Sequence, residues 1–372
     1  MPEHDVLIVG AGPVGLLLAC LLAQEGLQVT ICERRTETDD RTRAIGIHRP
    51  GLDALDAAGV GGEVRAEALR LAGGEVRSRR RTLATLTFDP DRSVLVLPQP
   101  HTDAVLRARL RALAPGALVV GCEVREVRQT NDEVVVATET IEGSREVTAS
   151  MVVVADGVRS RLRGDLGIGW RPRPGRGAYS MLDVDDETPG DRAILHCEPD
   201  GLVECFPLPG GRRRWVVREG EEEVGSAAGF RRAVRQRTGL DLDLPAGVQP
   251  TSFVATQHMA TRVHRGRVVL LGDAAHEVSP IGGQGMNLGW ADAVCLAEQL
   301  VRALPTRVPD LAAYAHHVRR GAAMAGRRSR FYMSMGAPAP AAVVQGRELV
   351  MRALGSAPLR GWTTGLLTMR GI

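Results

Sequence analysis

Lysine is absent from this sequence: all 47 basic residues among its 372 are arginines. A chain without lysine cannot form a Schiff base through a lysine side chain. It also cannot use a lysine as a general base or bind nucleotide phosphates through a P-loop lysine. Several enzyme classes are therefore excluded before any motif is considered.

Paired cysteines and long apolar runs are missing as well. No CxxC pair and no Cys/His cluster is present, so we expect no metal site and reduced thiols in a cytoplasmic protein. No run approaches the roughly 18 apolar residues of a membrane helix. The apolar run from Val6 lacks a basic leader and is broken by glycines, so we expect no secretion signal. The six cysteines are Cys20, Cys32, Cys122, Cys197, Cys205 and Cys295.

The charge is nearly balanced, with 47 basic and 44 acidic residues, a net charge of +3 and a pI near 8.7. This balance predicts neither a nucleic acid nor a membrane surface as partner. A composition of 44% apolar and 24% charged residues is typical of a globular protein. The length predicts one large α/β domain or two intertwined domains.

The first 33 residues read as strand, glycine-rich turn, helix, strand and acid. Val6–Val9 is a short apolar run that ends in Gly10-Ala11-Gly12-Pro13-Val14-Gly15, a GxGxxG sequence. Helix formers follow from Leu16 to Glu25, and the second apolar run, Leu27–Cys32, ends at Glu33. This order predicts a dinucleotide-binding unit, and it does not distinguish NAD from FAD because both contain ADP.

Each of these residues has a physical task in such a unit. Gly10 permits a tight turn, Gly12 lets a diphosphate approach the backbone, and Gly15 lets the helix pack closely on the strand. The helix N-terminus offers free N–H groups to the phosphates. Glu33, about 20 residues after the glycines, is suited to accept hydrogen bonds from a ribose.

A second motif follows another apolar run at residues 151–154. Asp156-Gly157 is followed by Ser160 and Arg163 in a DGxxSxxR spacing. The alternative interpretation is structural: a strand followed by a helix N-cap, with the arginine on a solvated face.

A third motif follows the apolar run Val268–Leu271. Gly272-Asp273 ends this run, Pro280 and several glycines form a loop, and a helix is predicted from Gly285. The aspartate is suited to bind the ribityl chain of a flavin. The helix N-terminus is suited to the pyrimidine edge of the isoalloxazine ring, which becomes negative on reduction.

Together the three motifs resemble the single-component FAD-dependent aromatic hydroxylases, the group A flavoprotein monooxygenases of the para-hydroxybenzoate hydroxylase fold. The resemblance covers roughly residues 1–320. It implies an α/β fold with a discontinuous Rossmann-like FAD-binding domain of the GR2 type, an inserted antiparallel β-sheet substrate domain and C-terminal helices.

Smaller matches extend the resemblance. Arg43-Ala44-Ile45-Gly46 resembles the family's Arg-Ala-x-Gly turn, and the stretch around Gln99 resembles a PQxxTxxxL sequence of the aromatic polyketide hydroxylase subgroup. Many members of that subgroup continue into a thioredoxin-like domain, which we expect this chain to lack. The implied cofactor contacts are Gly10, Gly12, Pro13, Gly15, Glu33, Arg34, Arg43, Gln99, Val124, Asp156, Gly157, Asp273, Pro280, Gly283, Gly285, Met286 and Asn287.

The implied domains are an FAD-binding domain (1–73, 98–168 and 265–335), a substrate domain (74–97 and 169–264) and a helical tail (336–372). Period-two alternation predicts strands at 178–184, 193–198, 202–206 and 214–218, with a hairpin turn at 198–201. Helices are predicted within 219–237 and over 310–335, and a last helix is predicted near 343–355.

The resemblance implies an FAD-dependent monooxygenase that consumes NADPH or NADH. Reduced FAD would capture O₂, and a C4a-hydroperoxyflavin would hydroxylate a phenolic or polycyclic aromatic substrate. Pro280, beside the flavin, would present its carbonyl to a substrate hydroxyl. We expect a monomer or homodimer. Two alternatives remain: an FAD-dependent reductase or oxidase acting on a quinone-like or unsaturated molecule, and a flavin-fold binding protein without turnover.

Several other polar or aromatic residues are interpreted as structural. His276 is not expected to act as a base, and His316-His317 is expected on a solvated helix face. Trp170, Trp290 and Trp362 are expected to pack in the core. The register of the antiparallel sheet is open, so its candidate polar residues are interpreted as core or surface rather than catalytic. These are Tyr179, His196, Cys205, Arg214 and Trp215.

Overall fold

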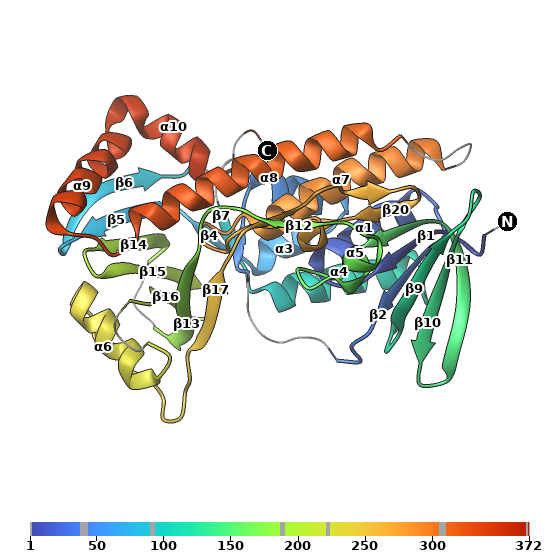
Figure 1. The fold of residues 1–372 in the computed structure, drawn as a ribbon. Helices are drawn as coiled ribbons and strands as arrows, with labels where there is room; N and C mark the ends of the chain where they lie inside the picture. Colours follow the sequence, from blue (N-terminus) through green and yellow to red (C-terminus); the bar gives the residue numbers. More distant parts are fainter. Residues whose placement is uncertain are drawn as a thin grey trace.

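Two sheets organise the molecule, one largely parallel and the other largely antiparallel, and they lie in two halves placed side by side (Figure 1). Helix α8 (Ala312–Met335) extends along both halves. No helix in the described part of the chain is long and apolar enough to cross a membrane. The computed structural model describes residues 2–37, 44–89, 94–186, 190–220, 224–304, 310–369 and 371.

The apolar runs noted in the sequence form the centre of the first sheet. Its strands follow the order β19-β20-β11-β1-β2-β8, and the strands β20, β11, β1, β2 and β8 run parallel. Both faces of a parallel sheet are covered, so its strands are apolar throughout. The bounds are β1 (His4–Val9), β2 (Val29–Glu33), β8 (Leu118–Val120), β11 (Gly143–Val154), β19 (His264–Arg265) and β20 (Val268–Leu270).

Several helices pack with this sheet in one hydrophobic core, among them α1 (Pro13–Gln24), α4 (Gln99–Leu113) and α7 (Gly285–Ala303). The first half of β11 also continues into an antiparallel meander with β10 (Val134–Thr140) and β9 (Glu123–Gln129). Trp290 of α7 is fully buried, and its indole donates a hydrogen bond to the carbonyl of Pro13 (3.0 Å), as expected of a packing residue.

The second sheet has seven strands in the order β17-β13-β16-β15-β14-β5-β6. Helix α6 (Ala227–Thr238) covers one face through Phe230, Ala233 and Val234. The other face packs on α8 and α9 (Ala341–Gly355). The bounds are β5 (Gly73–Ser78), β6 (Arg81–Thr87), β13 (Gly177–Asp185), β14 (Arg192–Glu198), β15 (Gly201–Leu208), β16 (Arg212–Arg218) and β17 (Thr251–Ala255).

Smaller elements connect the two halves. Two three-stranded sheets are formed by β3 (Gly46–Ile47), β7 (Val94–Val96) and β4 (Leu69–Leu71), and by β12 (Trp170–Pro172), β18 (His258–Ala260) and β21 (His276–Glu277). The remaining helices before α8 are α2 (Arg49–Ala57), α3 (Gly61–Glu67), α5 (Arg161–Asp165) and the 3₁₀ turn η2 (Gly272–Ala274).

The predicted mixed α/β fold is confirmed, together with the four strands predicted from alternation and the hairpin at Glu198–Gly201. Helix α6 begins later than the predicted segment because Ser226 caps it, accepting the N–H of Gly229 (3.2 Å). The domain boundaries stay a prediction: β5 and β6 belong to the seven-stranded sheet, whereas β7 pairs with β3 and β4.

The C-terminal region contains two helices where one was predicted. Helix α9 begins at Ala341, and α10 (Ala357–Leu367) follows it after Ser356. None of the residues of α10 is fully buried. Trp362 lies on this helix and is 60% exposed, so the expectation that it packs in the core was wrong.

Candidate cofactor and substrate site

The sequence motifs meet at one edge of the parallel sheet. Gly10 follows β1, Glu33 ends β2, Asp156 lies just beyond β11, and Asp273 lies just beyond β20. The hydrogen bond from Ala155 N–H to the Val9 carbonyl (2.8 Å) holds the ends of β1 and β11 in register. Ligands of α/β sheets bind at the carboxyl ends of the strands, so this edge is the candidate site.

The glycine loop leaves room for a ligand where the sequence predicted it. Gly10 has φ of +104°, and a Cβ there would lie 2.5 Å from the Ala155 carbonyl oxygen. A Cβ at Gly15 would lie 2.2 Å from the Gly10 oxygen, whereas a Cβ at Gly12 would meet nothing within 4 Å. Helix α1 begins at Pro13 without a side-chain cap, so its first N–H groups remain available to an anion. This cradle fits a diphosphate.

Glu33 holds the glycine loop through hydrogen bonds. Its carboxylate accepts the N–H of Ala11 (2.8 Å) and the N–H of Arg35 (3.0 Å). Arg107 of α4 donates from Nη2 to the Ala11 carbonyl (3.2 Å) and so places a cation beside the same loop. Arg107 could not be predicted from the sequence, because nothing in its position along α4 indicates that it faces the glycines.

The DGxxSxxR motif contains a buried acid, Asp156, and a helix cap, Ser160. Asp156 Oδ1 is buried with no hydrogen-bond partner, and burial raises the pKa of this carboxyl. Ser160 caps α5 by accepting the N–H of Arg163 (3.1 Å), as the structural interpretation predicted. Gly157 has φ of +87°, which favours glycine.

Arg163 is buried, so the alternative interpretation was wrong in placing it on a solvated face. It donates to the carbonyls of Ala274 (3.1 Å) and Val158 (3.0 Å). Its guanidinium also lies 3.7 Å from the ring centroid of Trp170, which is therefore a packing residue. Because Ala274 follows Asp273, Arg163 links the second motif to the third.

The third motif presents its polar groups to the same edge. Asp273 lies in η2 and is exposed, and Pro280 is exposed as well. Gly282 and Gly283 have φ of +92° and +64°, and α7 then begins at Gly285 without a side-chain cap. Successive backbone N–H groups in such a turn, together with a helix N-terminus, form an anion-binding concavity.

Asn287 holds this loop in place. Its side-chain oxygen accepts the N–H of His48 (2.8 Å), and its amide donates to the carbonyls of Gly46 and Gly283 (2.9 Å each). Its side chain is therefore occupied by protein groups, which leaves its backbone for any contact with a cofactor. Met286, beside it, is partly buried.

His48 lies against the same loop and was not identified from the sequence. A Cβ at Gly283 would lie 3.3 Å from its Nε2, and its Nδ1 is buried without a partner. Burial and the nearby Arg328 guanidinium lower the pKa of His48 to about 4, so the ring is neutral at pH 7.

Four further residues were predicted as cofactor contacts. Gln99 begins α4, and its Nε2 lies 3.4 Å from Asp103 Oδ2. The carbonyl of Val124 accepts a hydrogen bond from Arg161 (2.9 Å). Arg34 is exposed, next to Glu33. Arg43 lies outside the described residues.

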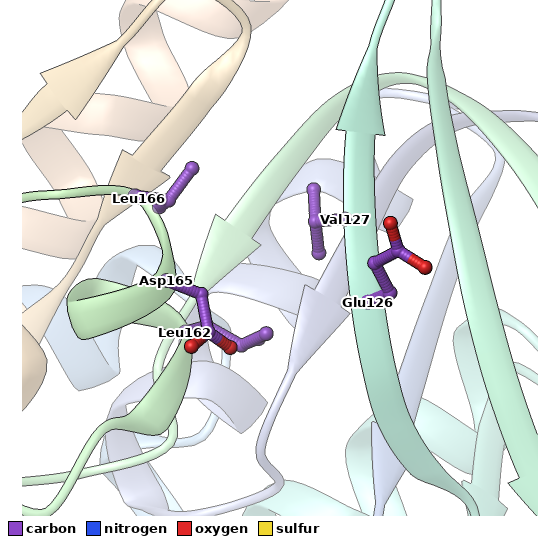
Figure 2. Close-up of a pocket in the computed structure, with 5 residues that line it drawn as sticks. All are labelled: Glu126, Val127, Leu162, Asp165 and Leu166. Atoms are coloured by element: carbon purple, nitrogen blue, oxygen red, sulfur yellow. The ribbon is translucent and has the colours of Figure 1, made fainter.

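A cavity of about 220 Å³ lies between β9 and α5 (Figure 2). Leu162, Leu166 and Val127 line it together with the carboxylates of Glu126 and Asp165. None of these lining residues belongs to the glycine loop, so this cavity is separate from the glycine-loop cradle. The two acids at its wall disfavour the phosphates of a dinucleotide.

His276 and Asp292 form a buried pair. His276 Nε2 and Asp292 Oδ2 are 2.5 Å apart, and both side chains are at most 1% exposed. Burial opposes the charged imidazole, but the Asp292 carboxylate reverses this effect and raises the pKa of His276. His317 lies 3.4 Å from Asp292 and is one-third exposed, so the expectation of a solvated face was wrong for His317.

The register of the seven-stranded sheet shows on which face its candidate residues lie. Cys205 and Trp215 pack toward α6. Tyr179 lies on the opposite face, in a cluster that includes Ile281 of the third-motif loop, and its hydroxyl is buried without a partner. Arg214 forms an ion pair with Asp183 (2.7 Å).

His196 of β14 is also buried, with neither ring nitrogen hydrogen-bonded within the described structure. It lies two residues from Ile194, which packs toward α6. Alternation along β14 therefore places His196 on the α6 face, away from the third-motif loop. Of the five candidate residues, Tyr179 is thus the one that packs in the same cluster as Ile281 of the third-motif loop.

Comparison with known proteins agrees with this geometry. Residues 3–328 match the protein family described as FAD binding domain. A 12-dehydrotetracycline 5-monooxygenase/anhydrotetracycline 6-monooxygenase of Streptomyces rimosus is 33% identical over 327 residues, which cover 80% of this chain and 62% of that protein. A dialkyldecalin synthase of Streptomyces rugosporus is 31% identical over 342 residues, which cover 86% of this chain and 70% of that protein.

The fold is shared with the crystal structure of p-nitrophenol 4-monooxygenase from Pseudomonas putida DLL-E4. The TM-score is 0.84 at 23% identity, and the match covers 99% of this chain and 98% of that one. The chain spans 62% of the length of the Streptomyces rimosus relative.

Proposed function

The chain belongs to the FAD-binding domain family, and from this premise we propose that it is an FAD-dependent monooxygenase that hydroxylates an aromatic substrate at the expense of NADPH or NADH. The family membership also confirms FAD, rather than NAD, as the bound dinucleotide. The observation that carries the proposal is the meeting of Gly10, Asp156 and Asp273 at one sheet edge, beside a loop that the antiparallel sheet covers.

The overall reaction balances with one O₂ consumed per turnover. One oxygen atom enters the aromatic ring as a hydroxyl, the other leaves as water, and NAD(P)H supplies two electrons while a proton comes from solvent. FAD, when bound, supplies the redox chemistry that couples these changes. The protein must bind and orient the reactants and exclude water.

The described residues suit these tasks. The glycine loop and the N-terminus of α1 would hold the diphosphate, Glu33 the ribose and Asp273 the ribityl chain. The N-terminus of α7, approached over Gly283, would stabilise negative charge on the pyrimidine edge. We assign the cofactor contacts to Gly10, Gly12, Pro13, Gly15, Glu33, Arg34, Arg43, Gln99, Val124, Asp156, Gly157, Asp273, Pro280, Gly283, Gly285, Met286 and Asn287, and we add Arg107.

The substrate would lie between this loop and the sheet face that carries Tyr179. Pro280 is the exposed residue of the loop, and its carbonyl oxygen is suited to accept a hydrogen bond from a substrate hydroxyl. A phenolic or polycyclic aromatic substrate is supported by the tetracycline monooxygenase among the relatives. The six cysteines are unpaired, which supports a reducing, cytoplasmic location, and we propose a monomer or homodimer.

The test is oxygen incorporation by the FAD-loaded protein. A panel of phenols is incubated with NADPH or NADH under ¹⁸O₂, and the product mass is measured. One labelled atom in the product supports the proposal. Substrate conversion without label would instead support the reductase, or a synthase activity such as that named for the Streptomyces rugosporus relative.

A pair of variants links the activity to the site. Asp273→Ala should lose most of its bound FAD, whereas Asp165→Ala, which removes a carboxylate from the separate cavity, should retain it. Equal FAD content in the two variants would contradict the assignment of Asp273.

A further inference from the structure

Glu204 occupies an unusual place on β15. Its neighbours in sequence, Val203 and Cys205, pack toward α6. Alternation along the strand therefore directs Glu204 to the opposite face, with Leu202. That face packs on Ile281, in the loop that the third motif builds beside the cofactor edge.

The direct register partners of Glu204 on this face are apolar, whereas the next same-face residues of β16 on either side are arginines. Its register partners are Val216 on β16 and Leu195 on β14, and both pack in the cluster that contains Ile281. Tyr179, whose buried hydroxyl also lacks a partner, belongs to the same cluster. The charge of Glu204 contributes to raising the pKa of Tyr179, after the larger effect of burial, so the two groups are within electrostatic reach.

The carboxyl of Glu204 has no partner of its own. The residue is 4% exposed, and none of the described residues donates it a hydrogen bond or forms an ion pair with it. Burial alone raises its pKa to about 7. Leaving such a group unsatisfied is costly, and buried carboxyls are ordinarily paired.

Two other acids of this sheet each have at least one partner, although Glu198 Oε1 is itself buried without one. Glu198 on β14 accepts the N–H of Arg79 (2.8 Å), and Asp183 on β13 pairs with Arg214 (2.7 Å). Glu204 differs from both, because neither of its oxygens has a hydrogen-bond or ion-pair partner among the described residues. An unpaired acid at the face beside the cofactor loop indicates that its partner comes from outside the chain.

We propose that Glu204 is a substrate-binding residue whose carboxyl oxygen accepts a hydrogen bond from a hydroxyl on the aromatic substrate, so that the site selects phenols over aromatic rings without a hydroxyl. This assignment rests on the proposed function and names its substrate class. A site built around a buried acceptor discriminates strongly against an analogue that leaves the acceptor unpaired. Because the compared ligands share one ring system, the aromatic ring itself would contribute little to the discrimination.

The test is ligand binding to the FAD-loaded protein, measured by perturbation of the flavin absorbance without NADPH. The probes are 1-naphthol, 1-methoxynaphthalene and 1-naphthylmethylamine, which present a hydroxyl, an ether and a cation on the same ring system. Wild type should bind 1-naphthol at least about tenfold more tightly than the ether, as expected for a hydrogen bond to a charged or buried acceptor. Similar affinities for naphthol and ether, or binding of neither, would overturn the proposal.

Substitutions of Glu204 test whether this residue causes the preference for 1-naphthol over the ether. Glu204→Leu should abolish the preference for 1-naphthol while the affinity for the ether changes less than about threefold, and the isosteric Glu204→Gln should keep part of it. Glu198→Gln is the matched control, a buried acid of the same sheet that already has a partner, and it should keep the preference. If Glu204→Leu retained the preference, or if the amine bound more tightly than the naphthol, the hydroxyl assignment would be wrong.

Failure of this proposal can be distinguished from failure of the monooxygenase proposal. The binding titration needs FAD but neither NADPH nor O₂. If the protein binds 1-naphthol through Glu204 but incorporates no ¹⁸O, the Glu204 proposal stands and the monooxygenase proposal fails. A thermal melt guards against misfolding: replacing a buried, unpaired acid should leave the protein at least as stable as wild type. A lower melting temperature for both Glu204 variants would indicate a structural role and would overturn the assignment.

Discussion

The unpaired carboxyl of Glu204 makes a quantitative prediction about stability and pH. Its pKa is raised from an ordinary value of 4.5 to about 7 by burial. Below pH 4.5 the group is protonated in both the folded and the unfolded chain. As the pH rises from 4.5 to 7, only the unfolded chain loses the proton, so the free energy of unfolding falls; above pH 7 the loss is constant.

The magnitude follows from the two pKa values. Each pH unit between them corresponds to about 1.4 kcal/mol, so the carboxylate lowers the free energy of unfolding by about 3 kcal/mol at high pH, of which about 2.5 kcal/mol develops between pH 5 and pH 8. An unfolding entropy of about 2 cal/mol/K per residue gives about 0.8 kcal/mol/K for this chain. The expected effect is a shift of about 3 °C in melting temperature.

The assay compares melting temperatures of wild type and Glu204→Gln at pH 5 and pH 8. The amide cannot ionise, so the melting temperature of the variant relative to wild type should rise by about 3 °C between the two pH values. Any constant cost of burying the amide cancels in this difference. The same substitution at the exposed Glu142 is the control and should give curves parallel to wild type. Parallel curves for Glu204→Gln would refute the reasoning.

Three further changes test other parts of the structure. Gly15→Ala places a Cβ 2.2 Å from a backbone oxygen of the same loop and should cut FAD content per protein several-fold; undiminished flavin content in the purified variant would contradict this. Asp292→Ala leaves His276 buried without its partner and should cost about 3–5 kcal/mol in denaturant unfolding. A loss below about 1 kcal/mol would show that the pair is not stabilised as described. Trp290→Phe removes the bond to Pro13 and part of a fully buried ring, so it should cost about 1–3 kcal/mol, and an unchanged denaturation midpoint would count against it.

Much of the cofactor edge could be predicted because its determinants are local. Gly10, Gly12 and Gly15 are required by backbone geometry within a few residues of one another, and the apolar strands that deliver them are short continuous runs. Parallel strands then bring their carboxyl ends together, so Asp156 and Asp273 could be assigned to the same edge from the strands that precede them.

The rest depended on contacts between distant segments. Arg163 is buried because Ala274 offers it a carbonyl and Trp170 offers it a ring, and neither partner is evident from the spacing of the motif. His317 faces inward because a buried carboxylate of α7 lies behind it. The expectation for Trp362 was wrong for the opposite reason, since the described elements leave it 60% exposed on α10.

By itself, the sequence determined the α/β class, the glycine cradle and the FAD-binding family, because these rest on local geometry and short-range pattern. Tertiary structure alone decided the sheet register, which turns Cys205 toward α6 and Glu204 toward the cofactor loop. Consecutive side chains of a strand point to opposite faces of the sheet. A shift of one residue in the strand register therefore exchanges the two faces. Only the hydrogen-bonded pairing of β15 with its neighbours fixes which residues the substrate would meet.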